Sequence, residues 1–250
     1  GLNHVRFAGS GSAPIPKEVI EWYRNLGLEL LEGYGMTENG SYSHVSKPGQ
    51  VRVGYVGAPL PGVECRISAE GEVLVKSPGN MTGYYKMPEK TAAEFTEDGF
   101  FKTGDQGEID EMGRLKITGR VKELFTTSKG KYVAPVPIEN QINTHPRVEA
   151  CCVSGTGYPQ PSGVGMLSEE AREVDRAVIE RELTAHLERI NAGLPPHEHL
   201  AFLAVARDEW LPENGFLTPT MKLKRSRLEK TYSAFADAWY AEKQPIVWQA

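Results

Sequence analysis

The segment YGMTENG, residues 34–40, gathers residue types that could hold a phosphate and its metal ion. Gly35 lets a backbone approach a ligand closely, Thr37 offers a hydroxyl, and the Glu38 carboxylate suits Mg²⁺, which prefers carboxylates together with phosphate oxygens. The segment follows LELL, residues 28–31, which has the apolar character of a buried strand. The alternative is a plain turn with a solvated glutamate, and the motif alone favours that alternative.

Two later segments carry further charges. KTGDQGEID, residues 102–110, is expected to hold Asp105 in a turn, and in ITGRVKE, residues 117–123, Arg120 is expected to close a strand. Asp105 lies between two glycines, and a carboxylate in such a turn can bind vicinal hydroxyls, as acids do with the ribose of nucleotides. Arg120 could reach the same ribose or a phosphate. The alternatives are an Asx-turn that opens a hairpin for Asp105, and a surface charge pair at a linker for Arg120 and Lys122.

The segment LTPTMKLKR, residues 217–225, places cations after a loop that Pro219 stiffens. A mobile loop that presents one lysine, here Lys222, is suited to stabilise charge on a phosphate oxygen during transfer. The alternative is the solvated, basic start of a helix, and a lone KLKR favours it.

The residues before about position 50 predict an α/β layer. Residues 4–9 are expected to form a strand, residues 16–27 a helix that Gly27 caps, and residues 28–35 a buried strand. On the helix, three residues have helical spacing and share one face: Val19, Tyr23 and Leu26. From about residue 50 to 120, short strands at VECRIS, EVLVK, FFKTGDQGEID and RLKITGR predict a small twisted sheet or barrel.

The residues after about position 121 predict a small α+β unit, so the fold class is mixed α/β and α+β. The expected elements are a strand at residues 123–127, a helix from Pro137, a strand through VEACCVS, a long helix at residues 173–193, a strand at LAFLAVA, and a closing helix to about Glu242. The long helix carries an apolar stripe: Val178, Leu183, Leu187 and Ile190.

Composition excludes several classes. The net charge of −5 argues against a nucleic-acid surface, which needs an excess of Lys and Arg. The three cysteines contain no C-x-x-C pair, which argues against a disulfide scaffold or zinc knuckle and favours a reducing, cytosolic setting. No apolar stretch has the length of a membrane span. The N-terminus reads as a strand entered part-way, so we expect a fragment of a longer chain.

Some tempting residues have simpler interpretations. His197 and His199 lack a third metal ligand nearby and are expected in a polar loop. Cys151 and Cys152 lie in an apolar strand and are expected in the core. Three aromatic residues near the C-terminus could contact a membrane or a partner: Trp239, Tyr240 and Trp248. Single aromatic residues, however, usually pack in the fold.

The order of the motifs is more specific than any one of them. YGMTE, TGD, GR-x-K-E and the late lysine resemble the C-terminal part of the adenylate-forming superfamily, which includes acyl-CoA synthetases, luciferases and the adenylation domains of peptide synthetases. TTSKGKYVAPVPIEN and LTPTMKLKR resemble long-chain fatty acyl-CoA synthetases. Short-chain and aryl relatives more often carry a glycine where this chain has Met221. The resemblance covers essentially all 250 residues.

One departure concerns the family's Ser/Thr/Gly/Lys phosphate loop, which lies upstream and is not contained in this chain. Most of the acyl tunnel would also lie upstream. The resemblance therefore implies that residues 1–120 are the tail of a large AMP-binding domain and residues 121–250 a small mobile domain. It also implies that the chain needs the N-terminal portion of the same polypeptide and is inactive alone.

The resemblance implies ATP-dependent activation of a fatty acid through an acyl-adenylate to acyl-CoA, with release of pyrophosphate and AMP. Glu38 would hold Mg²⁺, and Thr37 would hydrogen-bond the α-phosphate. Lys222 would bridge the acyl carboxylate and the α-phosphate. Asp105 would bind the ribose hydroxyls, with Arg120 beside it.

The resemblance also implies contacts around the adenine and coenzyme A. Gly11, Ser12, Ala13 and Pro14 would line the adenine, and Tyr34 would stack on it. Lys122 would be the hinge at which the small domain rotates between the two half-reactions. The loop at residues 128–135 would border the pantetheine channel, with Gly130 allowing close approach and Lys131 as a weaker contact.

Two alternatives remain open at this point. An adenylation enzyme of the same superfamily could pass the acyl group to a carrier protein instead of coenzyme A. A nucleotide-binding or regulatory module could keep the fold without the chemistry, although the presence of Glu38, Asp105 and Lys222 argues against that. We expect small-molecule substrates, no nucleic acid, and a cytoplasmic or membrane-peripheral location.

Overall fold

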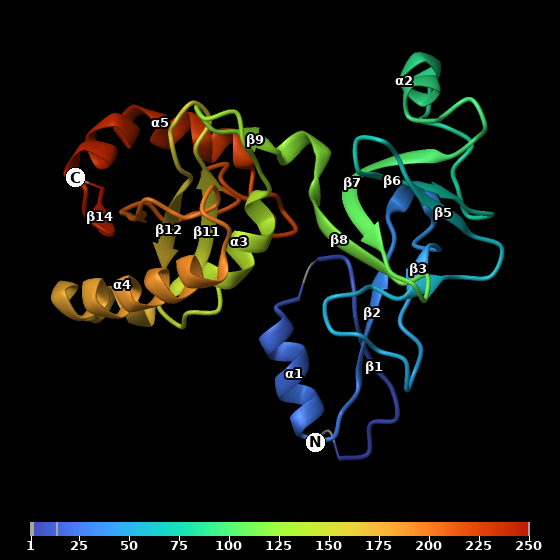
Figure 1. The fold of residues 1–250 in the computed structure, drawn as a ribbon, viewed down its shortest axis with the longest axis horizontal. Helices are drawn as coiled ribbons and strands as arrows, with labels where there is room; N and C mark the ends of the chain where they lie inside the picture. Colours follow the sequence, from blue (N-terminus) through green and yellow to red (C-terminus); the bar gives the residue numbers. More distant parts are fainter. Residues whose placement is uncertain (1–2, 14, 250) are drawn as a thin grey trace. The chain divides into compact units, whose positions relative to one another are not determined.

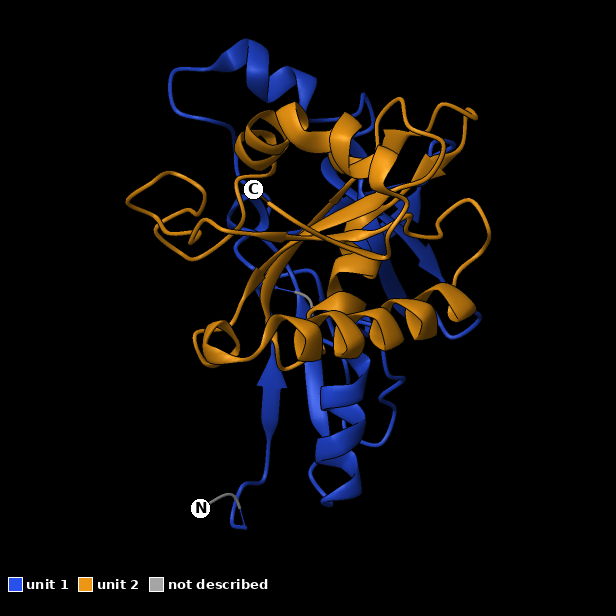
Figure 2. Cartoon of the chain, turned by 90° about the vertical axis from the view of Figure 1, so that its left-hand side faces the viewer, with its two compact units in different colours: residues 1–122 blue, residues 123–250 orange. Residues whose placement is uncertain are grey.

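The chain divides between Lys122 and Glu123 into two units, residues 1–122 and 123–250 (Figure 2). The structure, a computed structural model, describes residues 3–13 and 15–249. Within these ranges, no helix combines the length and the apolar character that crossing a bilayer requires.

The first unit begins with a β-α-β arrangement, as the sequence predicts. Strand β1 (Ala8–Ser10) runs parallel to β2 (Leu30–Tyr34), and α1 (Lys17–Asn25) connects them. Gly27 follows the helix at φ 84°, a left-handed backbone that glycine adopts without strain. The short strands β3 (His44–Val45) and β4 (Ala58–Pro59) complete this sheet in the order β1-β2-β3-β4.

The buried face of α1 is not the one that Val19 and Leu26 share. Ile20 is fully buried, whereas Val19 is 37% exposed and Leu26 is 64% exposed. Neighbouring helical positions lie about 100° apart around the axis. A rotation of the helix by one residue therefore exchanges Val19 for Ile20 against the strands.

The second sheet of this unit is an antiparallel meander. Its strands are β5 (Glu64–Ile67), β6 (Glu72–Lys76), β7 (Phe101–Ile109) and β8 (Leu115–Arg120), in the order β5-β6-β7-β8. The fully buried Val73, Val75 and Leu115 form its core, and the short helix α2 (Pro88–Ala93) lies between β6 and β7 in the chain. The predicted mixed α/β class is confirmed for this unit.

The second unit is a four-stranded sheet with helices on both faces (Figure 1). Strands β11 (Val148–Ser154) and β12 (Ser162–Leu167) pair antiparallel, and β13 (Leu203–Ala206) and β14 (Ile246–Trp248) add in parallel. Helices α3 (Pro135–Ile142) and α4 (Arg176–Gly193) pack on one face, and α5 (Arg225–Glu242) packs on the other. The hairpin of β9 (Phe125–Thr126) and β10 (Tyr132–Val133) precedes them.

Alternation along the strands builds the two cores of this unit. Cys151 and Val153 point to the α3 and α4 side, whereas Cys152 points to the α5 side. Successive side chains on a strand face opposite ways, so one strand serves both cores. Both cysteines are buried, as expected.

Several boundaries in this unit differ from the predicted ones. Helix α3 begins at Pro135, because proline suits the first helical position, where its missing N–H costs nothing. Helix α4 begins after Asp175, whose carboxylate accepts from the Ala177 N–H. Ile179, rather than Val178, is the fully buried residue near its start.

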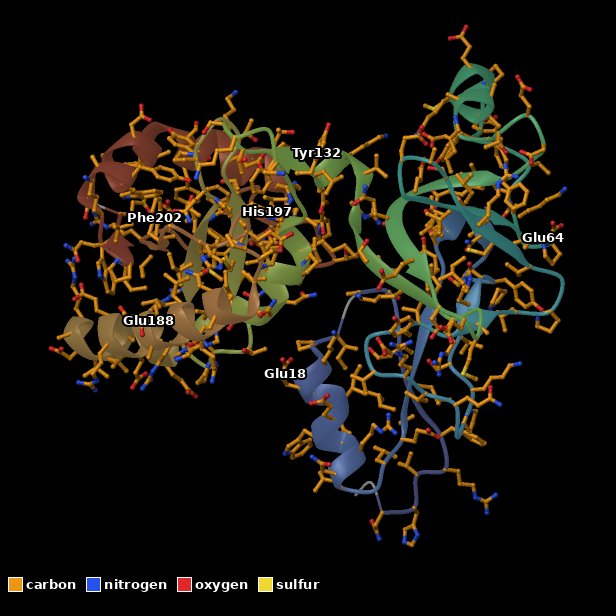
Figure 3. The ribbon with its side chains drawn as sticks, viewed as in Figure 1. Glu18, Glu64, Tyr132, Glu188, His197 and Phe202 are labelled. Carbon is orange, nitrogen blue, oxygen red and sulfur yellow. The ribbon has the colours of Figure 1, made fainter. Side chains whose placement is uncertain are left out.

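The aromatic residues near the C-terminus take part in packing. Trp239 is buried, and with Tyr240 it contacts Phe202, labelled in Figure 3. The Tyr240 hydroxyl donates to the Gln160 carbonyl at 2.6 Å, and the Trp248 indole N–H donates to Glu180 at 2.8 Å. Packing accounts for all three aromatics named in the sequence.

Candidate active site

The carboxyl ends of β1 and β2 bring the predicted adenine segment, which begins at Gly11, next to the YGMTENG turn. The strands are parallel, with Ser10 beside Glu32, so the residues that follow them lie at the same edge of the sheet. A side chain at Gly11 would meet the Gly33 carbonyl oxygen at 3.3 Å, so this segment stays against β2. Ser12 and Ala13 are exposed, and Ser12 has φ 69°. Pro14 lies outside the described residues.

The turn after β2 is tightly determined by its own residues. It contains a 3-10 helix, η1 (Thr37–Asn39), and the buried Asn39 accepts from the Met36 N–H at 2.9 Å. A Cβ atom at Gly35 would lie 2.6 Å from the Cα of Ser41. Gly35 is therefore required for the close approach of the chain to itself.

The two polar residues of this turn differ in their surroundings. Thr37 is exposed and Glu38 is half-buried. The Tyr84 hydroxyl donates to Glu38 Oε1 at 3.0 Å, and burial together with this bond raises the pKa of Tyr84 to about 12. Tyr84 is thus a protonated donor that holds the carboxylate by one oxygen. An oriented carboxylate next to an exposed hydroxyl suits a hard cation and its phosphate.

Asp105 and Arg120 meet across the pair of strands β7 and β8. They are register partners, and Arg120 Nε lies 3.0 Å from Asp105 Oδ1. The Asp105 side chain is 6% exposed and that of Arg120 is 57% exposed. The carboxylate is therefore held in a fixed place, while the guanidinium extends toward solvent.

Tyr34, at the end of β2, contacts the same carboxylate. Its hydroxyl donates to Asp105 Oδ2 at 2.6 Å. Burial, and next the charge of Asp105, raise the pKa of Tyr34 well above its ordinary value, so the hydroxyl keeps its proton. Thr103 Oγ1 accepts from the Asp105 N–H at 3.1 Å. The predicted adenine-stacking residue and the predicted ribose residue are in direct contact.

Two buried polar residues near this edge were not predicted as site residues. Glu32 is 7% exposed, and burial raises the pKa of its carboxyl to about 7. His44 is 2% exposed, burial lowers its pKa to about 4, and its ring lies 6.1 Å from that of Tyr34. Within the described residues, Glu32 Oε2 and His44 Nε2 have no hydrogen-bond partner. For Glu32, the sequence signal that could have found it is a glutamate inside the apolar run before Tyr34.

The remaining predicted residues lie at or beyond the end of the first unit. Lys122 is exposed in the 3-10 helix η2 (Val121–Glu123) and is the last residue of that unit. Gly130 turns the chain between β9 and β10 at φ 70°, next to the exposed Lys131. Tyr132, labelled in Figure 3, is 69% exposed on the same hairpin.

Lys222 lies on a closed turn of the second unit. Its N–H donates to Thr218 Oγ1 at 3.0 Å, and its carbonyl accepts from the Thr218 N–H at 2.8 Å. Met221, just before it, has φ 62° and is 63% exposed. This left-handed backbone favours glycine, the residue that the resemblance in the motifs implies here for short-chain and aryl relatives. The lysine side chain is exposed at the tip of the turn.

Comparison with known families matches both units. The model described as "AMP-binding enzyme" matches residues 1–85, and "AMP-binding enzyme C-terminal domain" matches residues 122–244. The chain belongs to the AMP-binding enzyme family. This confirms the superfamily resemblance found in the motifs.

Related proteins include several fatty-acid–CoA ligases. Long-chain-fatty-acid–CoA ligase FadD15 of Mycobacterium bovis is 33% identical over 95% of this chain and 42% of its own length. Putative fatty-acid–CoA ligase fadD11 of Mycobacterium tuberculosis is 35% identical over 100% of this chain and 47% of its own length. Human long-chain-fatty-acid–CoA ligase 1 is 32% identical over 95% of this chain and 38% of its own length. The chain thus spans less than half the length of these relatives.

Solved structures share the fold. The adenylation domain of a carboxylate reductase from Mycobacterium chelonae has a TM-score of 0.77 and 28% identity, over 94% of this chain and 38% of its own. ATP-bound MatB from Rhodopseudomonas palustris has a TM-score of 0.70 and 32% identity, over 91% of this chain and 45% of its own. These matches confirm the predicted fold class.

Proposed function

We propose that the full-length protein activates a long-chain fatty acid with ATP, forms an acyl-adenylate, and transfers the acyl group to coenzyme A. The family membership and the fatty-acid–CoA ligases among the relatives support this activity. The observation that carries the proposal is the Asp105 carboxylate, which is buried and held between the Tyr34 hydroxyl and the Arg120 guanidinium. A carboxylate with this support is suited to accept hydrogen bonds from ribose hydroxyls.

The first unit would bind the nucleotide. Gly11, Ser12 and Ala13 would line the adenine, with Tyr34 beside it. Arg120, exposed next to Asp105, would reach the ribose or a phosphate. The placement of residues 11–13 and of the Thr37 turn at one sheet edge supports a single nucleotide spanning both.

Glu38 would hold Mg²⁺, and Thr37 would donate to the α-phosphate. The fit rests on the Glu38 carboxylate, which Tyr84 orients through one oxygen, and on the exposed hydroxyl of Thr37. When bound, Mg²⁺ supplies neutralisation of the phosphate charges. The chain's own contribution is to orient the oxygen ligand and to position the α-phosphate.

The second unit would supply Lys222, whose ammonium would bridge the acyl carboxylate and the α-phosphate as charge develops between two anions. Lys122 would be the hinge between the half-reactions. The turn at Gly130 and the residues beside it, including Lys131, would border the pantetheine arm of coenzyme A. A cytoplasmic location fits these water-soluble cosubstrates.

The test is thioester formation by the full-length protein with ATP, Mg²⁺, coenzyme A and carboxylic acids from acetate to long fatty acids, with one aromatic acid. Product that peaks at long chains is the expected result. Acyl-AMP without thioester would instead support transfer to a carrier protein, which the similarity to an adenylation–carrier didomain of carboxylic acid reductase from Segniliparus rugosus favours as the second candidate. No adenylate from any acid would favour a nucleotide-binding module without catalysis.

A further inference from the structure

A buried arginine connects the start of the second unit to the turn that carries Lys222. Arg225 is the first residue of α5, three positions after Lys222, and its side chain is 13% exposed. The turn closes directly onto it, because the Lys224 N–H donates to the Phe216 carbonyl at 2.8 Å. The position of Arg225 therefore determines where the turn ends.

The guanidinium is held on one side by a forked contact. Arg225 Nη1 and Nη2 donate to the two oxygens of Glu139, on α3, at 2.7 and 2.8 Å. Glu139 is 6% exposed and also accepts from the Val153 N–H, while Arg225 Nη1 donates to the Val153 carbonyl at 3.1 Å. Bidentate arginine–carboxylate pairs combine strength with fixed geometry. The Lys222 turn is thus anchored to both α3 and β11.

The other side of the guanidinium contacts the first residue of the unit. Arg225 Nε lies 3.6 Å from Glu123 Oε2, and within the described residues this Nε makes no hydrogen bond. Glu123 directly follows Lys122, the last residue of the first unit. The contact is longer than the Glu139 fork and its carboxylate is more exposed, at 31%. It is the weaker and more easily released of the two.

We infer that Arg225 is a positioning residue that joins the hinge end of the second unit to its Lys222 turn, through Glu123. This inference rests on the proposed function. The Glu139 fork holds the Lys222 turn against α3 and β11. The Glu123 contact attaches the linker end to the same arginine. Rotation is then confined to the bonds around Lys122, so that the unit moves with a defined pivot and presents Lys222 in a reproducible position.

The test uses the Glu123 side of the contact in the full-length protein. Removing Arg225 would leave Glu139 buried and unpaired, which would destabilise the fold itself. Glu123→Gln keeps the shape and removes the charge. Glu229→Gln is the matched control, because Glu229 is a half-buried acid of α5 that interacts electrostatically with Arg225 but is not attached to the linker.

The first measurement is the rate of tryptic cleavage after the exposed Lys122 in the folded protein. Each rate is divided by the rate for a synthetic peptide that contains the same Lys122 bond, because Gln in place of Glu after Lys122 speeds trypsin by itself. A released linker end is expected to raise this normalised rate about fivefold in Glu123→Gln over wild type, with Glu229→Gln unchanged. The second is steady-state kinetics of pyrophosphate exchange and thioester formation. We expect kcat to fall about fivefold in Glu123→Gln with the KM for ATP unchanged, since the proposed ATP contacts of the first unit are untouched.

The two readouts separate this inference from the proposed function. Equal normalised cleavage rates in wild type, Glu123→Gln and Glu229→Gln would overturn the inference whatever the activity. Faster cleavage with unchanged kcat in an active enzyme would overturn the positioning role. If wild type adenylates no acid, the proposed function fails, and faster cleavage of Glu123→Gln alone would still support the attachment of the linker through Arg225.

Discussion

The Tyr34 hydroxyl donates a 2.6 Å hydrogen bond to the Asp105 carboxylate, although the two residues are 71 positions apart in the sequence. Tyr34 ends a strand of the first sheet, and Asp105 lies in the middle of a strand of the second sheet. The bond thus joins the two sheets of the first unit at the proposed nucleotide site. It also gives the buried carboxylate a donor in addition to Arg120, whose side chain is largely exposed.

Tyr34→Phe tests this bond. Loss of a hydrogen bond to a buried carboxylate is expected to lower the free energy of unfolding by about 1.5–3 kcal/mol. We also expect weaker AMP binding, because the carboxylate loses its orientation. Urea unfolding of the 250-residue chain and AMP titration of the full-length protein measure the two effects.

The matched control is Tyr42→Phe. The Tyr42 hydroxyl donates to the Pro61 carbonyl at 3.2 Å in an exposed position, so its loss is expected to change stability by less than about 0.5 kcal/mol. Equal losses in the two variants would mean that the Asp105 bond has no special role.

Glu32 predicts a pH dependence of stability. Burial raises the pKa of its carboxyl to about 7 from a reference of 4.5, so the folded state binds a proton that the unfolded state has already released between these values. Stability is therefore expected to fall as pH rises from 4.5 to about 7, by up to ~3 kcal/mol, and then to level off. Urea unfolding of the chain at pH 5 and pH 8 measures the loss.

Glu32→Gln is expected to remove most of this loss, because an amide carries no charge to bury. Glu64→Gln is the control, since Glu64 is exposed on β5 (labelled in Figure 3) and is expected to keep the wild-type slope. A Glu32→Gln variant whose stability still falls between pH 5 and pH 8 as in wild type would assign the dependence to other groups.

The sequence predicted the strands and helices with clear periodicity and missed those without it. β12, SGVGML, contains two glycines and is buried at every position, so it shows no alternation. β14 has only three residues. Val19 and Ile20 of α1 are both apolar, and only tertiary packing selects Ile20 for burial. Periodicity shows that a face exists, and its exact rotation depends on the neighbouring strands.

The sequence indicated which residues belong to the candidate site, but not which of them contact one another. The motif order indicated Glu38, Asp105 and Lys222, yet no local pattern links Tyr34 to Asp105, or Arg225 to Glu139, which is 86 positions away. Arg225 read as part of a solvated basic run, whereas its side chain is 13% exposed. Such pairs form only when separate elements pack, so a single sequence carries no signal for them.

Met221 predicts a substitution that changes stability in the unusual direction. Its backbone has φ 62°, which costs about 1–2 kcal/mol in residues with a Cβ atom. Met221→Gly removes that cost, but the greater entropy of the unfolded chain lowers stability by about 0.4–1 kcal/mol. The net effect is a gain of about 0.5 kcal/mol in the free energy of unfolding. Met112→Gly is the control, because Met112 is also 63% exposed and is not among the positive-φ residues. Thermal unfolding should show Met221→Gly slightly stabilised and Met112→Gly slightly destabilised, and the same sign in both would contradict the backbone argument.

Lys222→Ala tests the proposed chemistry with little risk to the fold. The side chain is exposed, and the hydrogen bonds of its turn use backbone atoms and Thr218, so the variant is expected to unfold at the wild-type temperature. Loss of a cation placed where charge develops is expected to slow pyrophosphate exchange by the full-length protein about 10²- to 10³-fold. Lys224→Ala removes an exposed lysine two positions away and is expected to keep most of the activity. Wild-type exchange in Lys222→Ala would exclude Lys222 from adenylation, whereas equal losses in both variants would indicate a general need for positive charge on this turn.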